Sequence, residues 1–179
     1  MIEITKRKSF LPITEELGSY LDQFDRRFTL PATYADLREF QQSYPLYDKS
    51  GHPTHWSTVM YERSHQQELW PKLTSIYSLL KTGDLHAVPH LYVERVDYCE
   101  FGNSRPFRVR MVNHYNDNYD HFYVKVADAS RIYGLELEHL LSPNRITYLA
   151  FEDTLVEEHI AGIPGDAFIR DYFERPDVN

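Results

Sequence analysis

The sequence predicts an α+β fold, in which a helical N-terminal segment is followed by a five-stranded antiparallel sheet with one inserted helix. Apolar residues recur mostly at helical spacing up to about residue 88, whereas apolar and polar residues alternate in the segments after it. In residues 121–141 an alternating pattern changes directly into a helical one. We therefore expect a helical extension (residues 1–87), a sheet domain (residues 88–163) and a C-terminal linker helix (residues 164–179).

Two short helices and a loop are expected first. One helix lies within residues 12–28, where Thr14 is a suitable N-cap and the two glutamates after it favour the positive end of the helix dipole. A shorter helix is expected within residues 31–44. Residues 47–56 contain a glycine and a proline and are expected to form a loop.

The longest helix is expected at residues 57–82. Ser57 can cap its start, Pro71 is expected to kink it, and Gly83 can end it in a left-handed conformation. The segment carries too many apolar residues for a free surface helix, so we expect it to pack on the sheet or on the shorter helices.

The sheet is expected to follow as two hairpins and a helical crossover. Its five strands are predicted at residues 90–98, 107–115, 121–127, 145–151 and 154–160. Asp128 or Ser130 can cap the inserted helix, which Pro143 stops.

The inserted helix is expected to cover residues 129–142. Tyr133, Leu137 and Leu140 lie at helical spacing, and we expect them to pack this helix on the sheet.

The charge and composition exclude several classes of protein. The chain of 179 residues has a formal net charge of −8, which repels phosphate backbones, so we expect no nucleic-acid partner. Cys99 is the single cysteine, which suits a reducing compartment. The sequence contains no apolar run of membrane-spanning length and no signal peptide, so we expect a cytoplasmic protein without a membrane partner.

Two short motifs resemble a known family. The order of strands and helix, together with the motif YVKVA at residues 123–127, is similar to the N-terminal, nucleotide-binding lobe of the protein-kinase-like superfamily, nearer to its small-molecule and atypical kinases. The resemblance implies that Lys125 binds the phosphates of ATP. It also implies that this lysine pairs with a glutamate of the inserted helix, for which Glu136 and Glu138 are the candidates.

The second motif, EHIAG at residues 158–162, resembles the family's hinge after its fifth strand. The resemblance implies that the backbone around Glu158 and Ile160 hydrogen-bonds adenine, and that Asp166 lies near the ribose. The turn containing Gly102 corresponds to the phosphate-covering turn of the family, which usually holds more glycines.

Three features depart from the family. Tyr123 stands where a small residue is usual, and Glu157 stands at the hinge entry where an apolar residue is common. The chain ends at Asn179, before the second lobe that holds the catalytic loop and the metal-binding aspartate of the family. We therefore assign no catalytic residue and no metal ligand, and expect weak ATP binding, with magnesium and phosphoryl transfer only if a second lobe completes the site.

Other constellations of reactive residues are weaker. His52 and His55 could offer two imidazoles to zinc, but no cysteine or fixed acidic residue completes a tetrahedral set. Cys99 has no activating base near it in the sequence. Two functions remain open: the nucleotide-binding lobe of an atypical phosphotransferase, or a non-catalytic module that keeps the lobe fold and binds a protein partner.

Overall fold

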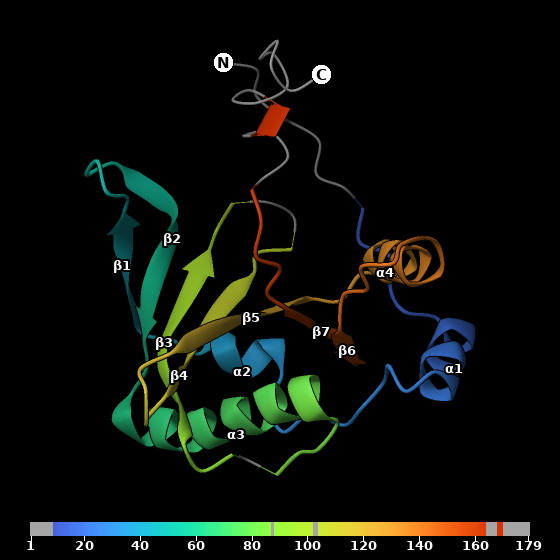
Figure 1. The fold of residues 1–179 in the computed structure, drawn as a ribbon, viewed down its shortest axis with the longest axis horizontal. Helices are drawn as coiled ribbons and strands as arrows, with labels where there is room; N and C mark the ends of the chain where they lie inside the picture. Colours follow the sequence, from blue (N-terminus) through green and yellow to red (C-terminus); the bar gives the residue numbers. More distant parts are fainter. Residues whose placement is uncertain (1–8, 87, 102–103, 164–167, 170–179) are drawn as a thin grey trace.

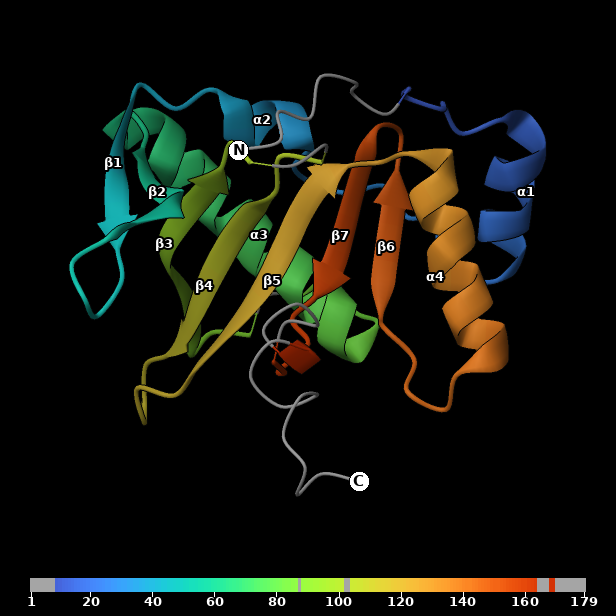
Figure 2. The same cartoon turned by 90° about the horizontal axis from the view of Figure 1, so that it is seen from above.

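A seven-stranded antiparallel sheet organises the protein (Figures 1 and 2). The computed structural model describes residues 9–86, 88–101, 104–163 and 168–169. The strands are β1 (Gln42–Tyr47), β2 (Pro53–Met60), β3 (Leu91–Cys99), β4 (Phe107–Asn113), β5 (Tyr119–Val126), β6 (Tyr148–Phe151) and β7 (Thr154–Glu158), in the spatial order β1-β2-β3-β4-β5-β7-β6. The helices are α1 (Glu15–Gln23), α2 (Tyr34–Arg38), α3 (Arg63–Thr82) and α4 (Ala129–Leu141). The α+β class is thus confirmed.

The sheet has seven strands rather than the expected five, and the sequence pattern did not reveal β1 and β2. We expected a helix within residues 31–44, a loop at residues 47–56 and a helix from Ser57. Instead α2 ends at Arg38, and β1 and β2 form a hairpin over residues 42–60. The reason is tertiary: β2 pairs with β3, with Ser57 opposite Tyr98, and this pairing outweighs a local pattern that suits helix and strand alike. The N-terminal segment is therefore not purely helical.

Local capping explains where the helices begin and end. Thr14 accepts a hydrogen bond from the backbone of Leu17 and starts α1, as expected. Helix α3 begins only at Arg63, because residues 57–60 of the expected helix belong to β2. It ends as expected at Gly83, whose φ of 76° is left-handed. Asp128 caps α4 by accepting a hydrogen bond from the backbone of Ser130.

The helices divide between the two faces of the sheet. Helices α2 and α3 cover one face, where Leu73 and Ile76 of α3 join Phe122 and Val124 of β5 in the larger hydrophobic core. In Figure 1, α3 runs along this face, whereas α4 and α1 lie beside β6 and β7 at one end of the sheet. No helix of the described chain has both the length and the apolar character needed to cross a membrane.

Helix α4 is rotated relative to the expectation. Tyr133, Leu137 and Leu140 were expected to pack on the sheet, but all three are exposed. Ile132 and Leu135 are buried instead, in a second core with residues of α1, β6 and β7. Both sets have helical spacing, and the second is selected because α1 packs on the same end of the sheet.

The orientation of α4 predicts opposite outcomes for two neighbouring substitutions. Ile132→Ala should lower the free energy of unfolding by about 2–5 kcal/mol, because it leaves a cavity in a closed core. Leu137→Ala should cost about 0.5 kcal/mol or less, because its side chain is exposed. Urea unfolding of both variants measures the difference. Equal losses, or a larger loss at Leu137, would contradict this orientation.

Candidate functional site

The second face of the sheet is polar over the strands that α1 and α4 leave uncovered. Alternation along β5 sends Phe122 and Val124 into the larger core, so that Tyr123 and Lys125 lie on the opposite face. We call this surface the open face and define it by side chains of β2–β5, β7 and the residue that follows β7. These are Trp56, Asp97, Arg108, His121, Tyr123, Lys125, Glu157 and His159.

Lys125 lies on the open face next to β7, and its partner is not the expected one. Lys125 is only 9% exposed, and its Nζ lies 2.5 Å from Oε2 of Glu157. Strand β7 lies beside β5 and places Leu155 opposite Lys125, so Glu157 is the diagonal neighbour on the same face. The lysine therefore pairs within the sheet rather than with α4.

Arg131 binds the same carboxylate from the first turn of α4. Its Nε lies 2.5 Å from Oε1 of Glu157, and its second guanidinium nitrogen lies 2.9 Å from Oε2. This two-pronged contact is the strong geometry for an arginine–carboxylate pair. One buried glutamate thus joins β5, β7 and α4 through two cations.

The shared carboxylate shifts the protonation of the cluster. Burial alone would raise the pKa of Glu157, but hydrogen bonds from Arg131 and the charge of Lys125 outweigh burial and hold this pKa below its ordinary value. Burial lowers the pKa of Lys125, and Glu157 offsets this only in part, because the positive charge of Arg131 acts in the same direction as burial. Two cations competing for one anion explain why the carboxylate is stabilised in its charged form while the ammonium is not.

Glu136 and Glu138 are not partners of Lys125, which corrects the expected pairing. Glu136 accepts hydrogen bonds from Tyr20 at 2.7 Å and from Tyr148 at 2.5 Å. The rotation of α4 directs Glu136 toward α1 and β6, and so away from the lysine. Its pKa stays below the ordinary value because these two hydroxyl groups and the nearby Arg26 outweigh the effect of burial.

The expected hinge lies beside the open face. His159 follows β7, and its Nδ1 lies 3.1 Å from the hydroxyl of Tyr123. The Glu158 backbone N–H already donates to Thr147, and its carboxylate lies 3.7 Å from Lys81, on the face that α3 covers. Ile160 is exposed.

Two expected site residues, Gly102 and Asp166, lie outside the described residues.

A row of aromatic and arginine side chains continues the open face toward β2. Asp97 is fully buried and accepts two hydrogen bonds from Arg108, at 3.1 and 2.7 Å. The guanidinium of Arg108 in turn lies over the ring of Trp56, 4.6 Å from its centre. The rings of Trp56 and Tyr123 are 6.2 Å apart. The open face therefore presents flat rings and fixed cations side by side.

His121 adds a neutral imidazole to this surface. Burial and the nearby positive charge of Arg108 lower its pKa to about 4, so it is uncharged at neutral pH. Its ring lies 5.6 Å from that of His159.

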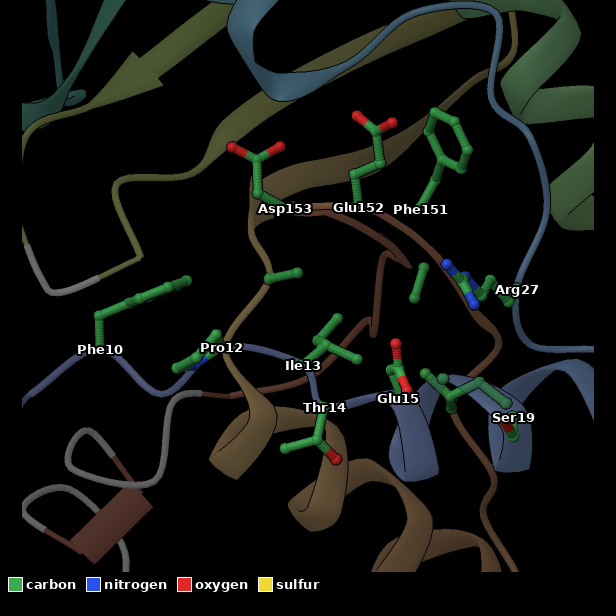
Figure 3. Close-up of a pocket in the computed structure, with 14 residues that line it drawn as sticks. Phe10, Pro12, Ile13, Thr14, Glu15, Ser19, Arg27, Phe151, Glu152 and Asp153 are labelled. Atoms are coloured by element: carbon green, nitrogen blue, oxygen red, sulfur yellow. The ribbon is translucent and has the colours of Figure 1, made fainter.

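Figure 3 shows a separate pocket, of about 640 Å³, at the start of α1. The turn between β6 and β7 forms one side of it with Glu152 and Asp153, and α1 forms the other with Glu15. Arg27 also lines the pocket, but its guanidinium already pairs with Asp22 at 3.2 Å. Charges of both signs line this pocket without converging, so we place the candidate site at the open face.

His52, His55 and Cys99, the other reactive residues considered in the sequence, are not part of the open face. His52 is near Asp48 in the β1–β2 turn, and the ring of His55 stacks on that of Phe101. Within the described residues, no three potential ligands gather into a metal site. Burial raises the pKa of the Cys99 thiol, which disfavours the reactive thiolate.

The chain was compared with family models, with curated proteins and with solved structures, and none of them matches it. The assignment of a function therefore rests on the geometry of the open face and on the resemblance of its motifs.

The role of Glu157 was missed in the sequence, although a signal was present. The two residues before it in the strand, Leu155 and Val156, are apolar and buried. A charged residue at a buried strand position requires a charged partner, and in the motif YVKVA only Lys125 offers one.

The lowered pKa of Glu157 predicts a specific pH dependence of stability. Its contribution to the free energy of unfolding is complete above the unfolded-state pKa and is lost as the pH falls through the lower folded-state pKa. The stability difference between the wild type and Glu157→Gln should therefore shrink as the pH falls below about 5.

Urea unfolding from pH 7 downward measures this difference. Glu94→Gln is the control, because Glu94 pairs with Arg110 at a more exposed position and should cost about 1 kcal/mol or less. A Glu157→Gln difference that stays constant over the acid range would show that the carboxylate does not carry this charge in the folded state.

Proposed function

We propose that the open face binds a nucleotide, and that the protein is the nucleotide-binding lobe of an atypical, kinase-like phosphotransferase. The observation that carries the proposal is the position of Lys125, a buried lysine whose Nζ lies 5.3 Å from the centre of the Tyr123 ring. The hydroxyl of Tyr123 in turn contacts the imidazole of His159. A fixed cation beside flat rings suits a ligand that combines phosphates with a planar base.

The cations supply the phosphate-binding part of the proposal. Lys125 and Arg131 converge on Glu157, which leaves two positive charges and one negative charge in a small volume. A phosphate group can take the place of part of the carboxylate's contacts, because it accepts hydrogen bonds from the same donors. In this proposal Glu157 holds both cations in position before the ligand arrives and exchanges contacts with the phosphate when it binds.

The aromatic side chains supply the base-binding part. Tyr123 lies between Trp56 on one side and His159 on the other, at ring distances of 6.2 and 5.8 Å. A base could stack on this row, as bases do on aromatic side chains of binding sheets. The N–H of Glu158 already donates to Thr147, so it cannot bind the base. We propose that the backbone after Glu158 contacts the base in its place.

The arrangement of elements supports the kinase-like reading beyond the single lysine. Three consecutive strands, β3 to β5, are followed by α4 and then by β6 and β7, and β7 lies next to β5. Helix α4 contacts the same face of the sheet as Lys125, through Arg131. We propose that magnesium and the groups that orient an acceptor come from a second lobe, so that ATP binds this chain alone only weakly.

The proposal predicts that Lys125 is required for ATP binding. Lys125→Met should weaken binding by about tenfold or more, because it removes the central cation but keeps the bulk of the side chain. Lys81→Met is the matched control: Lys81 lies on the face covered by α3, where it pairs with Asp120. It should leave ATP binding unchanged.

Calorimetric titration with ATP, with and without magnesium, tests the prediction, and circular dichroism verifies that each variant is folded. Wild-type protein that does not bind ATP at millimolar concentration contradicts the proposal, and so does equal binding by wild type and Lys125→Met.

A further inference from the structure

Helices α1 and α4 form an apolar groove that borders the second core. Its lining is Glu16, Leu17 and Tyr20 from α1 with Tyr133, Glu136, Leu137 and Leu140 from α4, and its volume is about 600 Å³. Leu140 is 74% exposed and Tyr133 is 55% exposed. Because α4 already buries Ile132 and Leu135 in the second core, this stripe is apolar surface beyond what folding of the described chain uses.

We infer that this groove binds an amphipathic helix of a protein partner, one that combines an apolar stripe with basic side chains. The inference concerns a surface separate from the open face and does not depend on nucleotide binding.

The shape of the groove is fixed before a partner arrives. The hydroxyl of Tyr20 on α1 donates to Glu136 on α4 at 2.7 Å, and so ties the two helices together at the base of the groove. Tyr148 donates to the same carboxylate from β6. A groove with a fixed base requires little reordering on binding, which favours affinity.

The backbone hydrogen bonds argue for a helical partner rather than an added strand. The edge of the sheet nearest to this groove is β6, where Ala150 donates to Arg26 and accepts from Phe28. These bonds occupy the edge that a strand would need at this position. The walls of the groove are helices, whose backbone groups bond within the helix, so the partner must satisfy its own backbone, as a helix does.

The spacing of the apolar residues suits a helix as well. Tyr133, Leu137 and Leu140 recur at intervals of four and three residues, which spans roughly 10 Å along α4. A partner helix can place two turns of apolar side chains against a stripe of this length.

The charges of the groove select a basic partner. Among the residues that the structure describes, Glu16 and Glu136 are its charged lining residues, and no lysine or arginine lines it. Glu136 is engaged by Tyr20 and Tyr148, whereas Glu16 is exposed at the rim. A lysine or arginine beside the apolar stripe of the partner can pair with Glu16, and the net charge of −8 attracts such a partner from a distance. The same charges oppose the pairing of two copies of this groove.

The test uses a synthetic peptide of leucine and lysine at helical spacing, labelled with a fluorophore, and the full chain. Fluorescence anisotropy should show binding that weakens about tenfold or more in the variant Leu137→Ser/Leu140→Ser. This variant keeps the charge of the protein, so the loss reports the groove and not general attraction of a basic peptide. Leu141→Ser is the matched control, because Leu141 is 81% exposed but does not line the groove, and it should bind as the wild type does.

Four further readouts decide the remaining points. Glu16→Gln should weaken binding by a few fold, and a peptide with glutamate in place of lysine should bind less tightly than the basic one. ATP binding by the Leu137→Ser/Leu140→Ser variant should equal that of the wild type, which separates this inference from the proposed function. Equal peptide affinity for wild type and double variant overturns the inference. Dimerisation of the wild type that the double variant abolishes, seen by light scattering, also overturns it, since the occupant would then be a second copy.

Discussion

The buried carboxylate of Glu157 is the constraint on which the functional face of this protein depends. It is shared by Lys125 of β5 and Arg131 of α4, and it belongs to β7 itself. Removing such a group would leave two cations partly buried without a counter-charge, which is far more costly than the loss of a surface ion pair. These ion pairs therefore favour the observed register of β5 and β7 and hold the start of α4 against both strands. It also explains how a lysine can occupy a nearly closed position in the sheet.

The two faces of the sheet differ in how far helices cover them, and the cluster of Lys125, Arg131 and Glu157 lies on the less covered face. On one face, α2 and α3 close the larger core and leave few polar groups, among them Asp120, which is bonded to Tyr77 and Lys81 of α3. On the other face, α1 and α4 cover only the strands at one end. The side chains of Trp56, Arg108 and Tyr123 therefore stay partly exposed, whereas Lys125 is nearly buried. The same docking of α1 on α4 leaves an apolar groove lined by both helices. The packing of α1 and α4 at one end of the sheet thus creates both the open face and the groove.

Features set by neighbouring residues in the chain could be predicted from the sequence, and features set by packing could not. The cap at Thr14 was predicted, and that of α4 was narrowed to Asp128 or Ser130, because a capping hydrogen bond joins residues two or three positions apart. Strand β2 was not predicted. Its sequence suits a helix and a strand about equally well, and the pairing with β3 decides between them. Lys125 was identified as the central site residue, but its partnership with Glu157 depends on β7 lying beside β5, which no local pattern encodes.

A double-mutant cycle on stability tests the central claim most directly. Lys125→Met and Glu157→Gln, alone and together, should show a coupling of about 1–3 kcal/mol in the free energy of unfolding, because the two side chains share a buried ion pair. The parallel cycle with Lys125→Met and Glu136→Gln should be additive within about 0.5 kcal/mol, because Glu136 is bound by the two tyrosines instead. Additivity in the first cycle, or coupling in the second, would contradict the account.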